Sequence, residues 1–319
     1  MTNNVFKAAV VQASPIFLDR KATVEKACGL ISDAASKGAK LIVFPEAYIP
    51  AYPDWVWVIP SGKKKMLDEL YAELLENSLT IPDQWTEKLC KAAKKAKAYV
   101  VMGLSERNSE ASNASLFNTL LYIDPDGKIM GKHRKLVPTG GERLVWSQGD
   151  GSTLEVFDTP LGKLGGLICW ENYMPLARYT LYSWGIQIYT APTWDHGEPW
   201  LSTLRHIAKE GSIYVLGSCI VMRKSDIPDK FEFKALYAPT KEWINTGDSV
   251  IIDPNGKIIA GPISMKEEII YADINPSLMQ GTKWILDTAG HYSRPDIFKL
   301  SVNTSPNKMI TTIKNENDK

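Results

Sequence analysis

Three reactive side chains of different chemical types stand at the ends of apolar stretches in this sequence. Cys169 and Glu46 each follow a strand-like apolar run, and Lys135 directly precedes another apolar run. In α/β sheets, functional groups gather where strands end, because the strand ends of one sheet meet along a common edge. A carboxylate base, a cation and a thiol are the parts of an activated nucleophile, so these residues indicate covalent thiol chemistry.

The four cysteines differ in their surroundings. Cysteine is among the most buried residue types, and Cys28, Cys90 and Cys219 fit that structural interpretation. The first two lie on apolar faces of expected helices, and the third lies inside an expected strand. Cys169 differs because an aromatic residue and two polar residues follow it. A free thiol has a pKa of about 8.5, so a nucleophilic cysteine needs a nearby cation or base.

Each of the other candidates also has a plain structural interpretation. A buried carboxylate at Glu46 must be paired or neutral; it is either an ordinary ion-paired residue or a general base whose pKa is raised by burial. Lys135 belongs to the basic cluster of residues 132–135, and such clusters usually form a solvated face. Glu142 lies in a glycine-rich stretch that either lets the backbone approach a ligand or forms a surface turn.

Histidine offers a competing mechanism, since a Cys–His dyad is a common arrangement in thiol hydrolases. His196, in the stretch Trp194-Asp195-His196-Gly197, is the best candidate for that role. The residues around Cys169 carry no signature of a Cys–His family. We therefore favour a Cys–Lys–Glu arrangement.

Composition argues against several classes of function. The 319 residues include 37 basic and 36 acidic side chains, and the net charge of +1 gives no electrostatic basis for binding nucleic acid or an anionic membrane. No apolar run reaches the roughly 18 residues of a membrane helix, and the N-terminal stretch lacks the basic region of a signal peptide. No Cys-x-x-Cys pair indicates a zinc site. We expect a cytoplasmic protein that needs no metal.

The elements that must position these residues alternate between helix and strand. Apolar residues at helical spacing predict helices, and short apolar runs predict strands. The expected helices cover residues 21–37, 63–79, 83–97, 176–184 and 200–210, and the expected strands cover residues 6–12, 41–44, 99–104, 187–191 and 214–221.

Two hairpins interrupt this alternation. Residues 120–131 and 250–259 each contain the turn sequence Asp-Pro-x-Gly-Lys, flanked by strand-like residues. The similar hairpins suggest a duplicated layer, and they favour mixed sheets over purely parallel ones. We predict an α/β fold, a four-layer α-β-β-α sandwich of two mixed sheets, in a single domain over residues 1–300. The polar residues 301–319 are predicted to form a flexible C-terminal tail.

Five stretches together resemble the nitrilase superfamily, specifically its true nitrilase branch. They are Phe44-Pro45-Glu46-Ala47, Lys132-His133-Arg134-Lys135-Leu136, Pro138-Thr139-Gly140-Gly141-Glu142-Arg143, Cys169-Trp170-Glu171-Asn172-Tyr173-Met174-Pro175-Leu176 and Gly290-His291-Tyr292-Ser293-Arg294-Pro295-Asp296. The resemblance implies a catalytic triad of Glu46, Lys135 and Cys169, with Glu142 as an additional active-site acid. It also implies the four-layer fold and homodimers or larger assemblies formed through the helices after the cysteine.

The residues after Cys169 resemble those of nitrile-hydrolysing members, whereas cyanide-degrading relatives typically carry His where Asn172 stands. The implied reaction converts a small-molecule nitrile into a carboxylic acid and ammonia through a covalent thioimidate and then a thioester. It needs no cofactor. We interpret Glu171 mainly as a structural acid.

Three alternatives stay open. An amidase of the same superfamily would use the same residues on an amide bond. A nitrilase-fold binding protein would have no catalysis, although the intact set of four residues argues against it. A redox-sensing thiol would require a second cysteine close to Cys169, and Cys219 is the one whose position the sequence leaves undetermined.

The aromatic residues near these motifs indicate the substrate class. We expect Tyr52, Trp146, Trp170 and Trp194 to bind substrate, and an aromatic-lined pocket would suit an aromatic or arylaliphatic nitrile. The alternative is that these large side chains fill the core and subunit interfaces.

Overall fold

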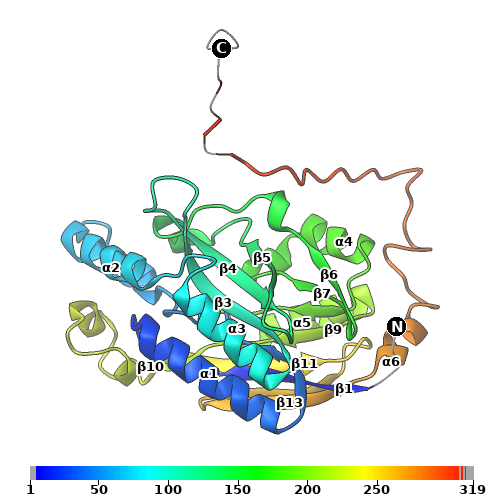
Figure 1. Ribbon diagram of the computed structural model, residues 1–319, viewed down its shortest axis with the longest axis horizontal. Coiled ribbons are helices and arrows are strands. Elements are labelled where there is room, and N and C mark those ends of the chain that lie inside the picture. The colour runs from blue at the N-terminus through cyan, green and yellow to red at the C-terminus, as the bar shows by residue number, and fades with distance from the viewer. Residues whose placement is uncertain (1–4, 309, 312, 314–319) are drawn as a thin grey trace.

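The computed structural model describes residues 5–308, 310, 311 and 313 and consists of two mixed β-sheets that lie face to face with helices on their outer faces (Figure 1). The first sheet has the strand order β13-β1-β2-β3-β4-β5. Its strands are β1 (Phe6–Gln12), β2 (Ala39–Val43), β3 (Tyr99–Arg107), β4 (Leu116–Ile123), β5 (Ile129–Arg134) and β13 (Glu268–Ile274).

The second sheet has the order β10-β11-β9-β8-β7-β6, with β12 paired to β11. Its strands are β6 (Val156–Thr159), β7 (Gly162–Gly166), β8 (Ile188–Thr190), β9 (Tyr214–Gly217), β10 (Val221–Arg223), β11 (Trp243–Ile252) and β12 (Ile258–Ser264). The helices are α1 (Arg20–Ser36), α2 (Lys64–Asn77), α3 (Gln84–Ala96), α4 (Pro175–Ser183), α5 (Glu198–Gly211) and α6 (Pro276–Thr282).

Strand alternation explains the four layers. Successive side chains of a strand point to opposite faces of its sheet, and both faces of the first sheet are apolar. Ala9 and Val11 of β1 pack in one cluster with buried residues of α1 and α3, whereas Ala8 and Val10 pack in a cluster shared by the two sheets. In the second sheet, Val215 belongs to a third cluster with α4 and α5. The predicted α-β-β-α fold is therefore confirmed.

The two sheets repeat one topology, as the paired hairpins suggest. Strands β1, β2 and β3 run parallel and continue into the antiparallel hairpin β4–β5. Strands β7, β8 and β9 likewise run parallel, and the hairpin β11–β12 pairs antiparallel beside β9. The hairpin turns match, since Gly127 and Gly256 have φ angles of 79° and 80°, a left-handed conformation that glycine adopts without steric cost.

Local capping sets the helix boundaries within a few residues of the predicted ones. Asp19 accepts a hydrogen bond from the Ala22 backbone at the start of α1, and Asp83 and Thr86 form a capping box at α3. Such caps satisfy backbone N–H groups that have no partner inside the helix.

The single strand expected over residues 214–221 is wrong. Regular strand structure is interrupted between β9 and β10. There the Ser218 hydroxyl donates to the Val11 carbonyl oxygen at 2.7 Å, and the Cys219 N–H donates to Ser249. In this interval Cys219 forms an isolated β-bridge with Thr193, and the Thr193 N–H donates to the Ser218 carbonyl oxygen at 2.8 Å. Cys219 therefore lies in the break, outside any strand.

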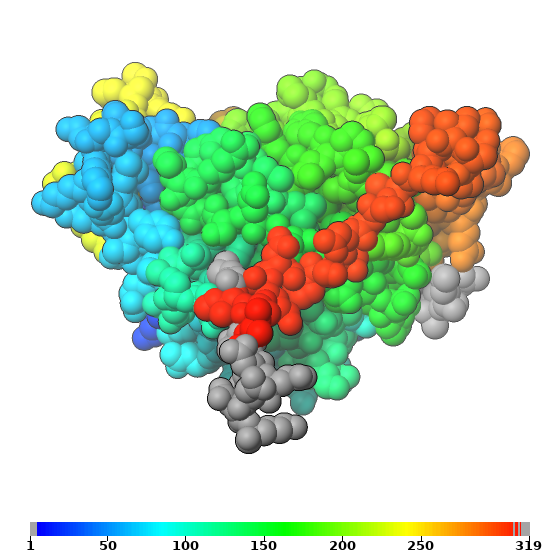
Figure 2. Space-filling view, turned by 90° about the horizontal axis from the view of Figure 1, so that it is seen from above, coloured from blue at the N-terminus to red at the C-terminus, as the bar shows by residue number. Residues whose placement is uncertain are grey.

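The described residues after α6 contain no helix or strand. Figure 2 shows this segment, coloured orange to red, running across the green middle part of the chain. The Asn307 N–H donates to the Asp150 carboxylate at 2.6 Å. The domain boundary at residue 300 and the flexibility of the tail stay predictions, and residues 309, 312 and 314–319 of that tail lie outside the described residues.

Among the described residues, no helix combines the length and the apolar character required to cross a membrane.

Candidate active site

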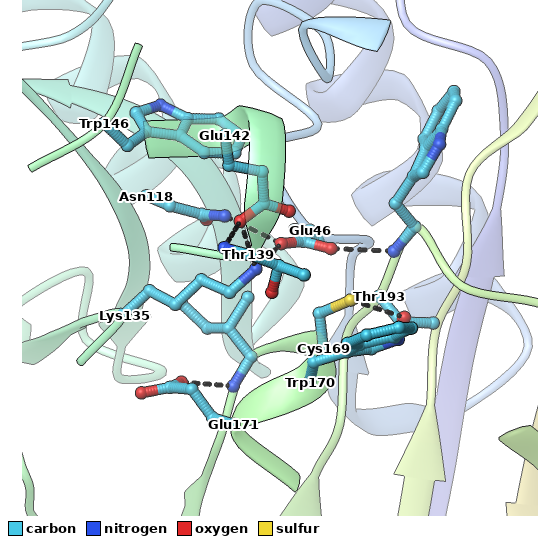
Figure 3. A network of polar contacts seen from close by, with 12 residues as sticks. Glu46, Asn118, Lys135, Thr139, Glu142, Trp146, Cys169, Trp170, Glu171 and Thr193 are labelled. Carbon is cyan, nitrogen blue, oxygen red and sulfur yellow. Dashed lines mark hydrogen bonds and ion pairs between the residues drawn. The ribbon is translucent and has the colours of Figure 1, made fainter. Parts of the chain in front are cut away.

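The two sheets bring the four expected site residues together (Figure 3). Glu46 lies three residues after β2, Lys135 directly follows β5, and Cys169 begins the 3-10 turn Cys169–Tyr173, which follows β7. Glu142 lies in a second 3-10 turn, Gly140–Leu144. All four side chains are buried, although they come from segments up to 123 residues apart (Glu46 to Cys169).

Backbone geometry fixes the thiol. Cys169 has a φ angle of 52°, in the left-handed region that residues other than glycine rarely adopt. Its N–H donates to the Pro192 carbonyl oxygen at 2.9 Å, and the Thr193 hydroxyl donates to its sulfur at 3.3 Å. Strained backbone of this kind persists where the surrounding structure holds it, and it is concentrated at functional sites.

Lys135 lies between two carboxylates. Its Nζ is 2.8 Å from Oε1 of Glu46 and 2.7 Å from Oε2 of Glu142, and solvent reaches none of the three side chains appreciably. A buried charge is tolerated only when it is paired and hydrogen-bonded. The lysine therefore belongs to a buried ion-pair network and not to the solvated face that its basic neighbours alone would predict.

Further hydrogen bonds fix each carboxylate. Glu46 accepts from the Asn118 amide and from the Trp194 backbone N–H, each at 2.7 Å. Glu142 accepts from the Thr139 backbone N–H and the Tyr52 hydroxyl, each also at 2.7 Å. Such charge-assisted hydrogen bonds hold both acids in one orientation around the ammonium.

Loop placement at Glu46 depends on a glycine in the neighbouring strand. A Cβ atom at Gly103 of β3 would lie 2.0 Å from the Pro45 carbonyl oxygen, far inside van der Waals contact. Glycine therefore lets the Pro45–Glu46 segment approach β3 closely. That close approach brings Glu46 to the edge where β5 delivers Lys135.

The charges of the site perturb one another. Burial raises the pKa of Glu46, with Lys135 opposing and Glu142 reinforcing this shift. Burial alone would lower the pKa of Lys135, but Glu46, Cys169 and Glu142 outweigh it and raise the pKa. Burial and the charge of Glu46 raise the pKa of the Cys169 thiol, whereas Lys135 and the Thr193 hydrogen bond act in the opposite direction. Thiolate formation at this site therefore depends on the ammonium and on a base that removes the proton.

A cavity of about 740 Å³ opens onto Cys169. Its aromatic lining comprises Tyr52, Trp57, Trp170 and Trp194. Tyr52 stacks on Trp194 with ring centroids 4.4 Å apart and planes 5° from parallel. Trp170 is half exposed, and its indole N–H donates to Asp195 at 2.8 Å.

Trp146, expected to bind substrate, lies away from the cavity, whereas Trp57 lies at it. Trp146 is buried behind Tyr52 against Ser105 and is not among the residues that line the cavity. Trp57 does line the cavity, and its indole N–H reaches the Tyr52 hydroxyl at 3.2 Å. The proximity of Trp57 to Tyr52 in the sequence was the only signal that could have indicated its position.

Among the described residues, no hydrogen bond joins the Cys169 side chain to His196 or to Cys219, although the charge of Cys169 is one cause of the raised pKa of Cys219. His196 lies at the cavity but is exposed. Cys169 and Cys219 are both free thiols, and the Cys219 thiol lies 3.5 Å from the Asp195 carbonyl oxygen. Across the same residues, no group of three or more His, Cys, Asp or Glu side chains is arranged to hold a metal ion.

Comparison with known proteins identifies the family. A sequence model described as carbon-nitrogen hydrolase matches residues 7–283. The chain is 41% identical to an aliphatic nitrilase of Sinorhizobium fredii (strain HH103), with 96% of this chain and 98% of that protein covered. It is 42% identical to nitrilase 2 of Arabidopsis thaliana, with 98% and 93% covered. A bifunctional nitrilase/nitrile hydratase of Lupinus angustifolius is 40% identical, with 96% and 88% covered.

Solved structures agree on the fold. The C. elegans NitFhit protein aligns with a TM-score of 0.73 and 21% identity, covering 97% of this chain and 70% of that one. A carbon-nitrogen hydrolase from Helicobacter pylori G27 aligns with a TM-score of 0.70 and 20% identity, covering 92% and 97%. The family match, the near-complete coverage of the relatives and the shared fold lead to one assignment. The chain belongs to the carbon-nitrogen hydrolase family, in its nitrilase branch.

Proposed function

We propose that this protein is a nitrilase that hydrolyses a nitrile to its carboxylic acid and ammonia, with Cys169 as the nucleophile. The observation that carries the proposal is the placement of the Cys169 thiol at a cavity beside Lys135, which Glu46 and Glu142 hold in place. Identity of about 40% with several nitrilases over nearly the whole chain supports the same reaction.

The first half of the reaction forms a covalent bond to sulfur. Glu46 accepts the Cys169 proton while the sulfur attacks the nitrile carbon, and it then passes that proton to the nitrile nitrogen, which gives a thioimidate and regenerates the carboxylate. Burial raises the pKa of Glu46, which brings this carboxylate closer to the neutral pH at which a general base works best. Lys135 stabilises the negative charge that develops on nitrogen.

The second half consumes two water molecules. The first water, activated by Glu46, adds to the thioimidate carbon, and the resulting tetrahedral species expels ammonia to leave a thioester. A second water breaks the carbon–sulfur bond, which releases the carboxylic acid and returns the proton to the thiol. Glu142 contacts the Lys135 ammonium directly, and its role is to orient that cation.

The cavity supports an aromatic or arylaliphatic substrate. Tyr52, Trp57, Trp170 and Trp194 present flat apolar surfaces to it, and aromatic rings gain energy from stacked and edge-on contacts. Because one relative is named as an aliphatic nitrilase, the substrate class needs a direct comparison. We expect kcat/KM for phenylacetonitrile to exceed that for a short aliphatic nitrile, and the reverse order would contradict an aromatic pocket.

We also propose that the protein assembles as a homodimer through α4 and α5. Leu176 at the start of α4 is 67% exposed, and the nearby Tyr173 is 43% exposed, so both side chains are available to contact a second copy of the chain. Light scattering of wild type and of Leu176→Lys tests this, since we expect the variant to dissociate. An unchanged mass in the variant would count against this face.

Ammonia release from a nitrile panel tests the proposed reaction. The panel contains phenylacetonitrile, benzonitrile, a dinitrile and an aliphatic nitrile, each beside its amide, and Cys169→Ala is the control. We expect ammonia from nitriles with wild type and none above background with the variant, because loss of a nucleophile typically lowers kcat by several orders of magnitude. Ammonia from amides alone would make the protein an amidase, and activity in Cys169→Ala would refute the thiol mechanism.

A further inference from the structure

The proposed reaction leaves a buried ion pair beside the site without a role. His133 of β5 and Glu171 of the 3-10 turn Cys169–Tyr173 are 2% and 1% exposed. The His133 Nε2 lies 3.0 Å from one Glu171 oxygen and 3.2 Å from the other. In sequence, His133 precedes Lys135 by two residues, and Glu171 follows Cys169 by two residues.

The Glu171 carboxylate also binds the backbone on both sides of the site. Its Oε1 accepts the Leu136 N–H at 2.6 Å, and its Oε2 accepts the Ile168 N–H at 2.7 Å. Leu136 directly follows Lys135, and Ile168 directly precedes Cys169. One side chain therefore ties the segment that carries the ammonium to the segment that carries the thiol. Figure 3 shows one of the hydrogen bonds that Glu171 accepts.

The two segments belong to different sheets. Lys135 follows β5 of the first sheet, and Cys169 follows β7 of the second. A cluster of apolar side chains fills the space between the sheets, and apolar packing is not directional. Directional hydrogen bonds are therefore needed to fix how far one strand end slides along the other.

The hydrogen-bond partners of His133 favour an ionic pair. Its Nδ1 lies 3.1 Å from the Thr153 carbonyl oxygen, which can only accept, so Nδ1 donates. Its Nε2 faces a carboxylate, so an imidazolium satisfies both contacts. Burial alone would lower the pKa of His133, but the charge and hydrogen bonds of Glu171 outweigh it and raise the pKa.

We propose that His133 and Glu171 are positioning residues that hold the Lys135 ammonium in register with the Cys169 sulfur. The inference rests on the proposed function, because it assigns Lys135 the task of stabilising the thiolate and the charge on the substrate nitrogen. Glu171 lines the cavity, but the hydrogen bonds of the pair go to each other and to the backbones of Leu136, Thr153 and Ile168 and not to Glu46, Lys135 or Cys169. The effect of the pair is exerted through the backbone of Leu136 and Ile168.

Isosteric variants separate positioning from simple structural support. Glu171→Gln keeps the shape but replaces one acceptor oxygen with an amide donor, which then faces a backbone N–H. His133→Gln keeps a donor and removes the charge. The matched control is Glu106→Gln: Glu106 is equally buried and pairs with Lys132 and Arg134, the two neighbours of His133 on β5. None of the contacts of Glu106 reaches the segment that carries Cys169.

Two measurements report on the alignment of the Lys135 ammonium with the Cys169 sulfur. The first is the rate at which iodoacetamide alkylates Cys169 across pH 6–10, followed on the Cys169 peptide by mass spectrometry so that the other cysteines do not contribute. The second is kcat and KM for the best nitrile of the panel. Thermal unfolding of each variant reports stability separately. Alkylation requires no nitrile, so the alkylation measurement tests the positioning role even if the proposed substrate is wrong.

We expect Glu171→Gln and His133→Gln to alkylate Cys169 roughly tenfold more slowly at pH 8, because a thiol pKa raised by one unit leaves tenfold less thiolate. We expect kcat to fall about 10- to 100-fold with KM changed less than about threefold, since a misplacement of about 1 Å can lower the rate 10²-fold. The double variant should lose no more than the worse single one, because the two residues act as one unit. Glu106→Gln should lose thermal stability while both readouts stay within about threefold.

Three results would overturn the proposal. The first is an alkylation profile and a kcat equal to those of wild type in both Glu171→Gln and His133→Gln, which would leave the two residues only a structural role. The second is an equal loss in Glu106→Gln, which would attribute the effect to general disturbance of β5. The third is insolubility of both variants. Activity in Cys169→Ala would instead refute the proposed thiol mechanism, whatever these variants do.

Discussion

Replacing Lys135 with methionine tests the buried charge network most severely. The ammonium lies 2.8 Å from Oε1 of Glu46 and 2.7 Å from Oε2 of Glu142. Methionine fills much of the same volume without charge. The variant therefore leaves two buried carboxylates facing each other with the cation between them removed.

The geometry sets the size of the effect. Those two oxygens can be at most 5.5 Å apart, which is the two contacts of 2.8 Å and 2.7 Å laid end to end. At that separation, two like charges repel by about 3 kcal/mol with an effective dielectric constant of about 20. Repulsion of this size makes the pair take up a proton, and a protonated Glu46 cannot act as the base. Loss of the cation also removes stabilisation worth about 10²- to 10³-fold in kcat. We expect kcat to fall at least about 10³-fold.

Stability gives a second readout whose sign is fixed. A buried carboxyl with a raised folded-state pKa binds more protons in the folded than in the unfolded chain, so the free energy of unfolding falls as pH rises. Stability falls over the pH range that begins near the unfolded glutamate pKa of about 4.3 and extends upward to the raised pKa of the folded state. Between pH 5 and pH 8, the free energy of unfolding of Lys135→Met should fall by up to about 3 kcal/mol more than that of wild type. Urea unfolding at each pH measures this difference.

A control on β5, the strand that Lys135 directly follows, distinguishes loss of the buried charge network from general damage to the fold. Lys132 is also paired with a buried carboxylate, that of Glu106, but Arg134 binds the same acid. Lys132→Met should therefore keep kcat within about threefold. A Lys135→Met variant whose kcat falls less than tenfold, or whose stability follows the wild-type pH profile, would refute the reasoning.

Three further substitutions test single contacts. Thr193→Val removes the hydrogen bond to the Cys169 sulfur, and iodoacetamide should alkylate that thiol about fivefold more slowly, in line with about 1 kcal/mol; an unchanged rate would show that the bond does not support the thiolate. Tyr52→Phe removes the donor to Glu142 and should lower kcat about 5- to 10-fold with KM nearly constant, whereas a change in KM alone would make Tyr52 purely a substrate contact. Gly103→Ala places a Cβ inside a backbone oxygen and should lower stability by more than about 3 kcal/mol in thermal or urea unfolding; wild-type stability would mean that the neighbouring loop can move.

Local patterns in the sequence were sufficient to predict most helices and strands and to identify the polar residues at the strand ends. The short apolar run in β1 and the helical spacing in α1 and α3 depend on neighbours a few residues away, and the structure contains each of these elements. The sequence also singled out Glu46, Lys135 and Cys169, because a charged or reactive group at the end of an apolar run is visible without knowledge of the fold.

Contacts between distant residues could not be obtained in this way. The strand expected over residues 214–221 is interrupted where Ser218 and Cys219 contact Val11, Thr193 and Ser249, and Trp146 packs behind Tyr52; all of these partners are distant in the sequence. The pairing of His133 with Glu171 likewise joins two segments of different sheets.

The sequence by itself therefore identified the candidate reactive side chains and placed Glu46, Lys135 and Cys169 next to strand ends. Tertiary structure alone decided that Lys135 sits between Glu46 and Glu142 and that Glu171 links the lysine and cysteine segments. The physical reason is the range of the forces involved. Apolar periodicity fixes which face of an element is buried, but the register between two apolar sheets is set by directional hydrogen bonds whose partners are far apart in the chain.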